Sequence, residues 1–247
     1  MYVAVSTHCF ADKSIDEACQ LISDLEYDKV ELWLSEQGDH LKPSEIAADP
    51  DRFNTRFREM TRLSPVALCL EEDIDLATLR GLSKLAKLLR VTQITIPASQ
   101  VGTPFNTEID RLNEFLAVTS QDGIRISLKT KTGQMTEDPH TAVELCQAAR
   151  GLGLTLDPSY YICGPHRAAS FDQVYPYVFH THLRDSTPKK LQVQIGLGEV
   201  DYSRLITQLR SQNYARALSV DLHPTENDDE SRSLELRKMR MLLDSLI

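Results

Sequence analysis

The sequence of 247 residues predicts an α/β fold, a closed (β/α)8 or TIM barrel, formed by a single domain over residues 1–247. Three observations favour this fold. Short runs rich in β-branched residues alternate with longer segments of helical period, eight such runs are readable, and about 250 residues is the usual size of such a barrel. An open doubly wound sheet is the alternative, but no GxGxxG or GxxxxGK[ST] loop follows any predicted strand.

The predicted strands are short apolar or alternating runs that end at polar or turn-forming residues. They cover residues Tyr2–Ser6, Lys29–Leu34, Pro65–Leu70, Gln93–Pro97, Ile124–Lys129, Leu154–Asp157, Tyr177–Leu183 and Ala217–Leu222.

The predicted helices carry start signals and a buried stripe. Ser14 and Glu17 form a capping box, and apolar residues follow at the i, i+3, i+4 spacing of an amphipathic helix. Asp138 and Pro139 are typical of an N-cap and a first helical turn. A final helix over Ser231–Leu246 is expected to close the chain.

Composition and charge restrict the partners. With 27 basic and 36 acidic side chains the net charge is −9, which opposes binding to a phosphate backbone, so nucleic acid is not an expected partner. The five cysteines include no CxxC pair, so neither a disulfide framework nor a thiolate zinc site is indicated. No run approaches the roughly 18 apolar residues of a membrane span. We expect a cytoplasmic protein without a membrane partner.

The reactive groups of such a barrel lie at the carboxyl ends of its strands and in the loops that follow. These positions in the sequence hold several titratable or aromatic residues: His8, Glu31, Trp33, Glu71, Lys129, Lys131, Asp157, His180, His182, Asp185, Asp221 and His223. His180 and His182 share one face of their strand because side chains alternate with a period of two. His180 lies deeper and is expected to be a core histidine, while His8 and His223 are expected near the mouth.

Three of these groups follow consecutive strands and are candidates for a metal site. Asp157, His182 and Asp221 can converge in a closed barrel, and two carboxylates with an imidazole suit Mn²⁺, Mg²⁺, Zn²⁺ or Fe²⁺. The alternative is that each is a hydrogen-bonded strand end or helix cap. Glu31 is expected to point inward as a general base or a hydroxyl ligand, with a structural ion pair as the alternative.

Ile124, Ile126 and Leu128 lie on the opposite face of the strand from Lys129 and should pack under the helices. Because side chains alternate along a strand, Lys129 should then point into the barrel. A buried ammonium beside carboxylates would form a salt bridge and take the place of a cation. A desolvated lysine is also a Schiff-base nucleophile. If the strand ends one residue earlier, Lys129 reaches solvent instead. Arg184 and Asp185 offer groups for sugar hydroxyls or a phosphate, or else belong to a solvated loop.

Several segments together resemble the sugar phosphate isomerase/epimerase family of xylose isomerase-like TIM barrels, which is related more distantly to the endonuclease IV barrels. The resemblance rests on VELW at 30–33, LKTKTGQMTEDP at 128–139, LTLDPSYY at 154–161, HTHLRD at 180–185, QIGLGEVDYSRLI at 194–206 and LSVDLHP at 218–224. These segments occur in the family's order over about nine-tenths of the chain. They do not specify a substrate.

The resemblance implies one divalent metal held by a Glu after strand five, an Asp on strand six, a His on strand seven and a Glu on strand eight. Asp157 and His182 match two of these positions. Lys129 stands where the first Glu is expected, Asp221 where the second is expected, and Tyr160 where the family commonly has a His. An inward ammonium should pair with Asp157 or Asp221 and exclude the ion. We therefore expect the purified protein to bind Mn²⁺ or Zn²⁺ weakly or not at all.

The resemblance implies a sugar isomerase or epimerase-like protein that acts on a small carbohydrate, with one divalent metal (Mn, Mg or Zn) as its possible cofactor. Lys129, Asp221 and Glu31 are the candidate catalytic residues. The candidate substrate-binding residues are His8, Trp33, Tyr160, Arg184, Asp185 and His223. The alternatives are a catalytically inactive barrel that binds a carbohydrate or a protein, and a Schiff-base lyase or aldolase that uses Lys129.

Overall fold

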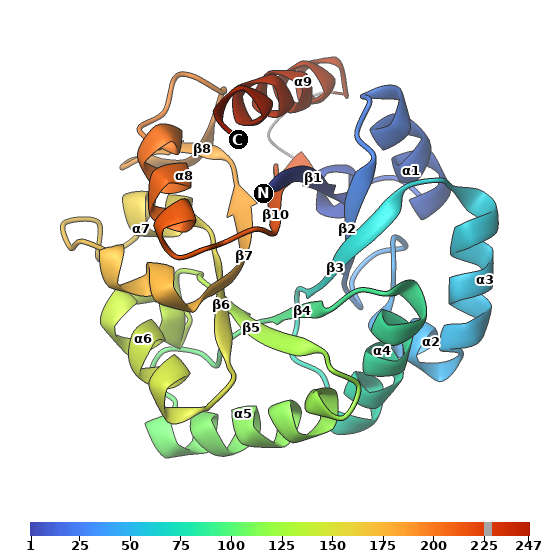
Figure 1. Ribbon diagram of the computed structural model, residues 1–247, viewed down its shortest axis with the longest axis horizontal. Helices are drawn as coiled ribbons and strands as arrows, with labels where there is room; N and C mark the ends of the chain where they lie inside the picture. The colour runs from blue at the N-terminus through green and yellow to red at the C-terminus, as the bar shows by residue number, and fades with distance from the viewer. Residues whose placement is uncertain (225–228) are drawn as a thin grey trace.

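The computed structural model describes residues 1–224 and 229–247, and these contain a closed barrel of parallel strands (Figure 1). The strand order around the barrel is β1-β10-β7-β6-β5-β4-β3-β2. The strands are β1 (Tyr2–Ser6), β2 (Lys29–Leu34), β3 (Ser64–Leu70), β4 (Gln93–Ile96), β5 (Arg125–Lys129), β6 (Gly153–Leu156), β7 (Val178–Leu183) and β10 (Ala217–Val220). The predicted (β/α)8 barrel is therefore confirmed.

Helices connect the strands and surround the barrel (Figure 1). The α-helices are α1 (Ile15–Asp24), α2 (Pro43–Ala48), α3 (Pro50–Met60), α4 (Leu76–Leu89), α5 (Phe105–Ser120), α6 (Pro139–Ala148), α7 (Pro158–Cys163), α8 (Tyr202–Ser211) and α9 (Asp229–Leu246). Short 3-10 helices lie at η1 (Thr7–Phe10), η2 (Met135–Glu137) and η3 (Asp172–Tyr177). Among the described residues, none of the helices has the length and apolar character needed to cross a membrane.

The helix starts follow from local hydrogen bonding. The Ser14 side chain accepts from the Glu17 amide and the Glu17 carboxylate accepts from the Ser14 amide, so the predicted capping box is confirmed. Asp138 caps α6 by accepting from the amides of His140 and Thr141.

The predicted strand bounds differ from the observed ones by a few residues at some ends. Strand β6 ends before Asp157, because the Asp157 side chain accepts from the amide of Ser159 and caps α7. A two-stranded antiparallel hairpin, β8 (Asp185–Thr187) and β9 (Lys190–Val193), occupies a segment whose sequence indicates a charged loop. Most hairpin side chains are polar, so the apolar periodicity that reveals a strand is missing.

The barrel interior below its mouth contains a layer of hydroxyl groups. Thr95 and Ser127 lie close to the Thr155 hydroxyl, at 2.7 and 2.6 Å. All three are fully buried. Because Ser127 points inward, Lys129 two residues later points inward as well and reaches the mouth of the barrel. The hydroxyl layer thus forms the floor beneath the residues at the strand ends.

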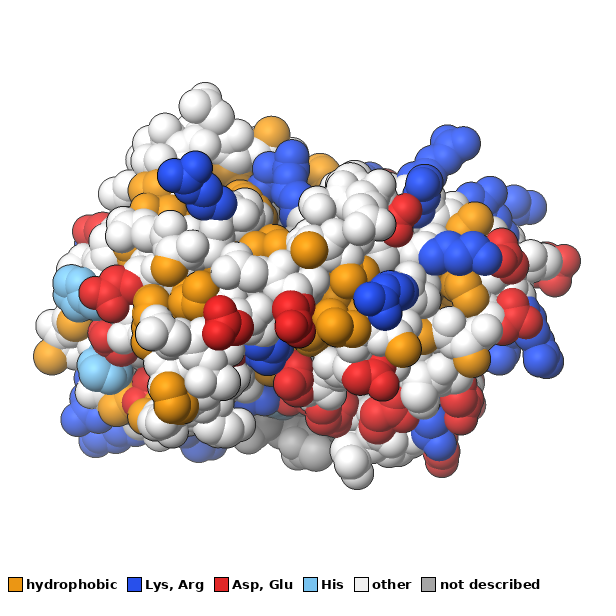
Figure 2. Space-filling model, turned by 90° about the horizontal axis from the view of Figure 1, so that it is seen from below, with side chains coloured by type: hydrophobic (Ala, Val, Ile, Leu, Met, Phe, Trp, Pro, Cys, Tyr) orange, Lys and Arg blue, Asp and Glu red, His pale blue; other side chains and the backbone are white. Residues whose placement is uncertain are grey.

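The outer surface carries acidic and basic side chains side by side. Figure 2 shows both signs interspersed on one face of the molecule, with apolar side chains between them. On this face, acidic and basic side chains are therefore mixed and do not form separate acidic and basic halves.

We predict that Gly81→Ala destabilises the protein although it lies within a helix. A Cβ at Gly81 would lie 2.7 Å from the Cβ of Ala47, where α2 packs against α4. Helix propensity alone would favour alanine by about 1 kcal/mol, but overpacking costs about 1–3 kcal/mol. We expect a lower urea midpoint for Gly81→Ala and little change for the exposed neighbour variant Arg80→Ala. An unchanged or higher midpoint for Gly81→Ala would contradict this packing.

Candidate active site

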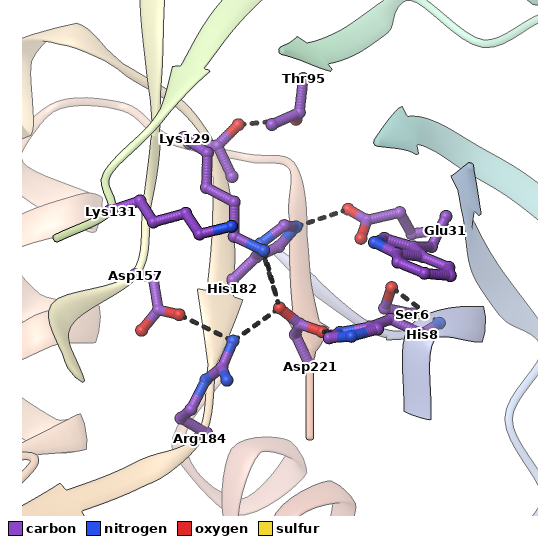
Figure 3. A network of polar contacts seen from close by, with 12 residues as sticks. Ser6, His8, Glu31, Thr95, Lys129, Lys131, Asp157, His182, Arg184 and Asp221 are labelled. Atoms are coloured by element: carbon purple, nitrogen blue, oxygen red, sulfur yellow. Dashed lines mark hydrogen bonds and ion pairs between the residues drawn. The ribbon is translucent and has the colours of Figure 1, made fainter. Parts of the chain in front are cut away.

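The carboxyl ends of the strands bring polar residues from distant parts of the chain together at the mouth of the barrel (Figure 3). Each lies on or directly after a strand, because parallel strands present their carboxyl ends at one edge. The residues that meet in this network are His8, Glu31, Lys129, Lys131, Asp157, His182, Arg184 and Asp221.

The carboxylate of Asp221 lies at the centre of the network. Its Oδ2 accepts from Nη2 of Arg184 at 2.7 Å and from Nζ of Lys129 at 3.3 Å. Its Oδ1 accepts from Nδ1 of His8 at 2.6 Å. Burial alone would raise the pKa of Asp221, but Lys129 and Arg184 outweigh it and hold the pKa well below its usual value. Asp221 is therefore an ionised, fully buried carboxylate.

Arg184 links the two aspartates of the network. Its Nη2 lies 2.9 Å from Oδ2 of Asp157 and 2.7 Å from Oδ2 of Asp221. The Asp157 contact is an ion pair by distance but lacks hydrogen-bond geometry, so Asp157 Oδ2 has no hydrogen-bond partner among the described residues. The guanidinium lies over the ring of Tyr160, 5.8 Å from its centroid. Arg184 is completely buried, and this position favours its pairing with both carboxylates.

The side chain of Lys129 points into the barrel and is 4% exposed. Burial opposes its charge, but the Asp221 carboxylate outweighs burial and raises the pKa of Lys129 well above its usual value. Lys129 is therefore an ammonium. A Schiff-base nucleophile requires the neutral amine, so this environment opposes the lyase alternative.

Glu31 forms a second cluster with two histidines. Its Oε2 contacts Nε2 of His182 at 2.9 Å and also Nε2 of His180. Burial raises the pKa of Glu31, but the two imidazoles outweigh burial and lower it. Burial lowers the pKa of His180. Glu31 is thus ionised, and His180 supports it from below the mouth.

An upper layer of partly accessible residues covers these buried groups. The ring of Trp33 stacks on His8 with centroids 4.7 Å apart, and His223 meets His8 edge-on at 5.0 Å. Glu71 accepts from Nε1 of Trp33 at 3.2 Å and from Nζ of Lys131 at 2.5 Å. Burial, followed by the charge of Arg184, lowers the pKa of His223 to about 3. His223 is therefore neutral near pH 7.

Asp185 does not join this network, although the sequence suggests it as a substrate-binding residue. Its Oδ2 accepts from the amides of Gly196 and Gly198 at 2.9 and 3.0 Å. Its Oδ1 accepts from the amide of Ser186 at 3.0 Å. These bonds use the carboxylate to fix the loop after β9, and Asp185 is 2% exposed.

Cys69 was not among the residues selected from the sequence as site candidates. It lies on β3, two residues before Glu71, so both share the inward face of the strand. Ligand atoms of Glu31, Cys69 and His182 lie within 4.8 Å of one another, which makes these three a possible metal-binding group. The spacing of two from Glu71 is the sequence signal that could have identified Cys69.

Comparison with known families identifies the class of protein. The model of the xylose isomerase-like TIM barrel family matches residues 19–240, so the chain belongs to this family. Comparison with curated protein sequences finds no significant match.

Solved structures with the same fold cover nearly the whole chain. L-ribulose 3-epimerase is 14% identical with a TM-score of 0.74, covering 100% of this chain and 96% of its own. A xylose isomerase-like TIM barrel protein from Mycobacterium smegmatis in complex with magnesium is 17% identical with a TM-score of 0.72, covering 98% and 97%. A probable 3-DHS dehydratase, AsbF, from Bacillus anthracis is 17% identical with a TM-score of 0.72, covering 97% and 98%. At these identities the similarity establishes the fold.

We predict that Arg184→Met destabilises the protein by about 3–5 kcal/mol near pH 7, because it leaves two buried carboxylates without their shared cation. The lowered pKa of Asp221 contributes stability above about pH 4, and this contribution is lost as the pH falls through the folded-state pKa. The variant has less of this contribution to lose. The difference in the free energy of unfolding between the wild type and Arg184→Met should therefore become smaller below about pH 4.

Urea unfolding of both proteins from pH 3 to 8 measures this difference. Arg204→Met is the matched control, because Arg204 pairs with Asp172 on the exposed surface. We expect no measurable change for the control. A deficit for Arg184→Met that is equally large at every pH would contradict the ion-pair explanation.

Proposed function

We propose that this protein is a sugar isomerase or epimerase-like enzyme that acts on a small ketose or aldose without a divalent ion between Asp157, His182 and Asp221. The observation that carries the proposal is the contact of one buried carboxylate, Asp221, with Lys129, Arg184 and His8. These contacts supply fixed positive charge and an oriented imidazole at the place where the family resemblance implies a metal.

The charge of this position opposes a divalent ion. Arg184 already contacts both aspartates, and Lys129 contacts Asp221. Two unit charges about 4 Å apart repel by about 4 kcal/mol at an effective dielectric near 20, and a divalent ion doubles this cost for each neighbouring cation. The donor set therefore does not fit a divalent metal unless the cations move away.

His8 is the best-placed proton carrier. Asp221, a candidate catalytic residue from the sequence, is an ionised carboxylate whose lowered pKa makes it a weak base. Asp221 accepts from Nδ1 of His8 and thereby leaves Nε2 as the basic nitrogen. His8 is 7% exposed at the mouth, whereas Asp221 and His182 are fully buried. His8 can therefore reach a bound sugar while Asp221 orients it.

Lys129 and Lys131 supply the positive charge for the reacting oxygen. Isomerisation and epimerisation remove a proton from the carbon beside a carbonyl, and the negative charge then develops on the carbonyl oxygen. Lys129 has three donors, and its described hydrogen bond to Asp221 uses one of them. Lys131 lies above it, paired with Glu71. The roles proposed are therefore His8 as base and Lys129 as electrophile, with Lys131 beside it.

The rim offers a surface for the carbon skeleton of a sugar. Trp33 is held by its stacking on His8 and by its hydrogen bond to Glu71. Aromatic rings of this kind pack against the apolar faces of small ligands, while convergent polar groups fix their orientation. Among the structural neighbours are L-ribulose 3-epimerase and a D-psicose 3-epimerase, which supports ketoses as the first substrates to test.

A carbohydrate-binding barrel without catalytic activity is the second candidate. The observation that favours it is the closure of the lower layer, since Glu31, Asp157, His182, Arg184 and Asp221 are all fully buried and bound to one another. A ligand would then contact only the rim. This candidate differs from the first in one respect, which is the absence of proton exchange at the carbon beside the carbonyl.

We predict that the protein catalyses exchange of that carbon-bound proton in D₂O with at least one ketose in the presence of EDTA. Proton transfer by a positioned side chain contributes about 10²–10⁴-fold to a rate, so His8→Gln should lower the exchange rate by about 100-fold or more. Lys129→Met should lower it by a similar factor. Nuclear magnetic resonance on ribulose, psicose, fructose and tagatose measures the exchange.

His140→Gln is the matched control, because His140 is an exposed histidine in the first turn of α6 and is not among the residues of the network described above. It should exchange at the wild-type rate. Sugar binding without exchange would favour the binding barrel, and a borohydride-trapped adduct on Lys129 would favour the lyase. Either result would overturn the proposed isomerase.

We predict that Lys129→Glu gains affinity for Mn²⁺, because it replaces a repelling ammonium with the carboxylate that the family resemblance implies at this position. Lys129→Met removes the charge without adding a ligand and should gain little. Isothermal titration with Mn²⁺ compares these variants with the wild type. Stoichiometric tight Mn²⁺ in the wild type, lost in Asp157→Asn, would refute the exclusion of the ion by Lys129 and Arg184.

A further inference from the structure

Glu31, Cys69 and His182 come from three different strands and meet below the rim. They lie on β2, β3 and β7, and each is fully buried. One ligand atom from each lies within 4.8 Å of the others. Figure 3 shows the Glu31 carboxylate directed at the ring of His182, on the side of that ring away from Asp157.

The Glu31 carboxylate lacks a permanent cation. In the described part of the chain its polar contacts are the imidazoles of His180 and His182, and its Oε1 has no hydrogen-bond partner. Asp157 and Asp221, by contrast, contact the guanidinium of Arg184. An imidazole carries a positive charge only when it is protonated, so a bound cation would supply the permanent counter-charge that this buried carboxylate lacks.

The ring of His182 has the arrangement of a metal ligand. Its Nε2 faces Glu31, while its Nδ1 lies 3.4 Å from Oδ2 of Asp221. A metal-bound imidazole usually directs its second nitrogen to a carboxylate, which fixes the tautomer and strengthens the ligand. Neither Lys129 nor Arg184 contacts Nε2 of His182 in the described structure. The guanidinium of Arg184 contacts the two aspartates, whereas the Lys129 ammonium interacts with Cys69 as well as with Asp221, and its charge favours the thiolate form of Cys69.

Cys69 determines which ion this group would select. A thiolate, an imidazole and a carboxylate together suit Zn²⁺ rather than Mg²⁺ or Ca²⁺, which prefer oxygen ligands. Three protein ligands also match the number found in zinc sites that keep a fourth position for another group. The Cys69 thiol makes no hydrogen bond among the described residues, so binding an ion would not break one.

We propose that Glu31, Cys69 and His182 bind one Zn²⁺ on the β2–β3 side of the barrel mouth. On binding, the zinc–sulfur bond replaces the S–H bond of Cys69, and the thiol proton leaves to solvent. One Zn²⁺, one thiolate and one carboxylate sum to zero charge, so the buried cluster acquires no net charge. His180 contacts Glu31 and holds its carboxylate in place.

This zinc site is independent of the proposed sugar chemistry. The sequence leads us to expect weak or no binding of Mn²⁺ or Zn²⁺ by the protein, on the ground of Lys129 near the position between Asp157, His182 and Asp221. The zinc site proposed here departs from that expectation. The proposed site shares only His182 with that position and uses its opposite nitrogen. Exchange activity in EDTA tests the proposed function, whereas metal content tests this site, so either proposal can fail while the other stands.

We predict that protein stripped with EDTA and then equilibrated with ZnCl₂ retains one zinc per chain after gel filtration, as measured by elemental analysis. Cys69→Ala and Glu31→Gln should lower zinc affinity by about 100-fold or more, since even outer partners of a ligand contribute about 10–100-fold. Asp157→Asn should retain zinc. Cys146→Ala is the matched control, because Cys146 is a buried cysteine on α6.

Titration of the wild type with Co²⁺ provides a test that does not depend on whether the variants fold. Ligation by Cys69 should give a near-ultraviolet thiolate-to-cobalt charge-transfer band, and bound Zn²⁺ should abolish it. Absence of zinc and of this band would overturn the proposal and leave Glu31 and the histidines as a hydrogen-bonded core. Zinc retained in Cys69→Ala and lost in Asp157→Asn would overturn it in favour of the other position.

Discussion

The buried carboxylate of Asp221 is the constraint on which the mouth of this barrel depends. It accepts from Lys129 at the end of β5, from Arg184 after β7 and from His8 in η1. A buried ammonium or guanidinium without a counter-charge is strongly destabilising, so both cations require Asp221 in its ionised form. The ion pairs therefore fix the ends of strands that are far apart in sequence, and they also fix the orientation of His8.

This constraint divides the mouth into two halves. One half holds Asp157, Arg184, Lys129 and Asp221 and is rich in permanent charge, whereas Glu31 on the other half contacts only imidazoles among the described residues. His182 lies between them, with one nitrogen toward each half. His182 thus lies between the position at which we expect metal binding to be opposed and the position at which we propose that zinc binds.

Much of this arrangement follows from strand periodicity, which predicts the barrel and the inward direction of Lys129, Glu31 and His182. The sequence could not predict which partners these side chains would find, because ion pairs depend on barrel closure and register. Asp185 reads as a site residue, yet amides of Gly196 and Gly198, more than ten positions later, use its carboxylate. Cys69 has no cysteine partner nearby in the sequence, so the pairs that are typical of thiolate zinc sites do not indicate it, and only its spacing of two from Glu71 places it on the inward face.

Under the proposed function, an ammonium takes the place of a metal ion, and this changes what the site can supply. An ammonium is attached to the chain and carries one charge, part of which Asp221 neutralises, so it polarises a carbonyl less than a divalent ion does. The base that removes the proton must then contribute more to the rate, so the position of this base matters more. His8 has a carboxylate partner on one nitrogen and lies at the rim, where the ring of Trp33 stacks on it. The proposed isomerase chemistry therefore requires a sugar to bind at the boundary between the rim and the buried ion pairs, in contact with both the imidazole and the ammonium.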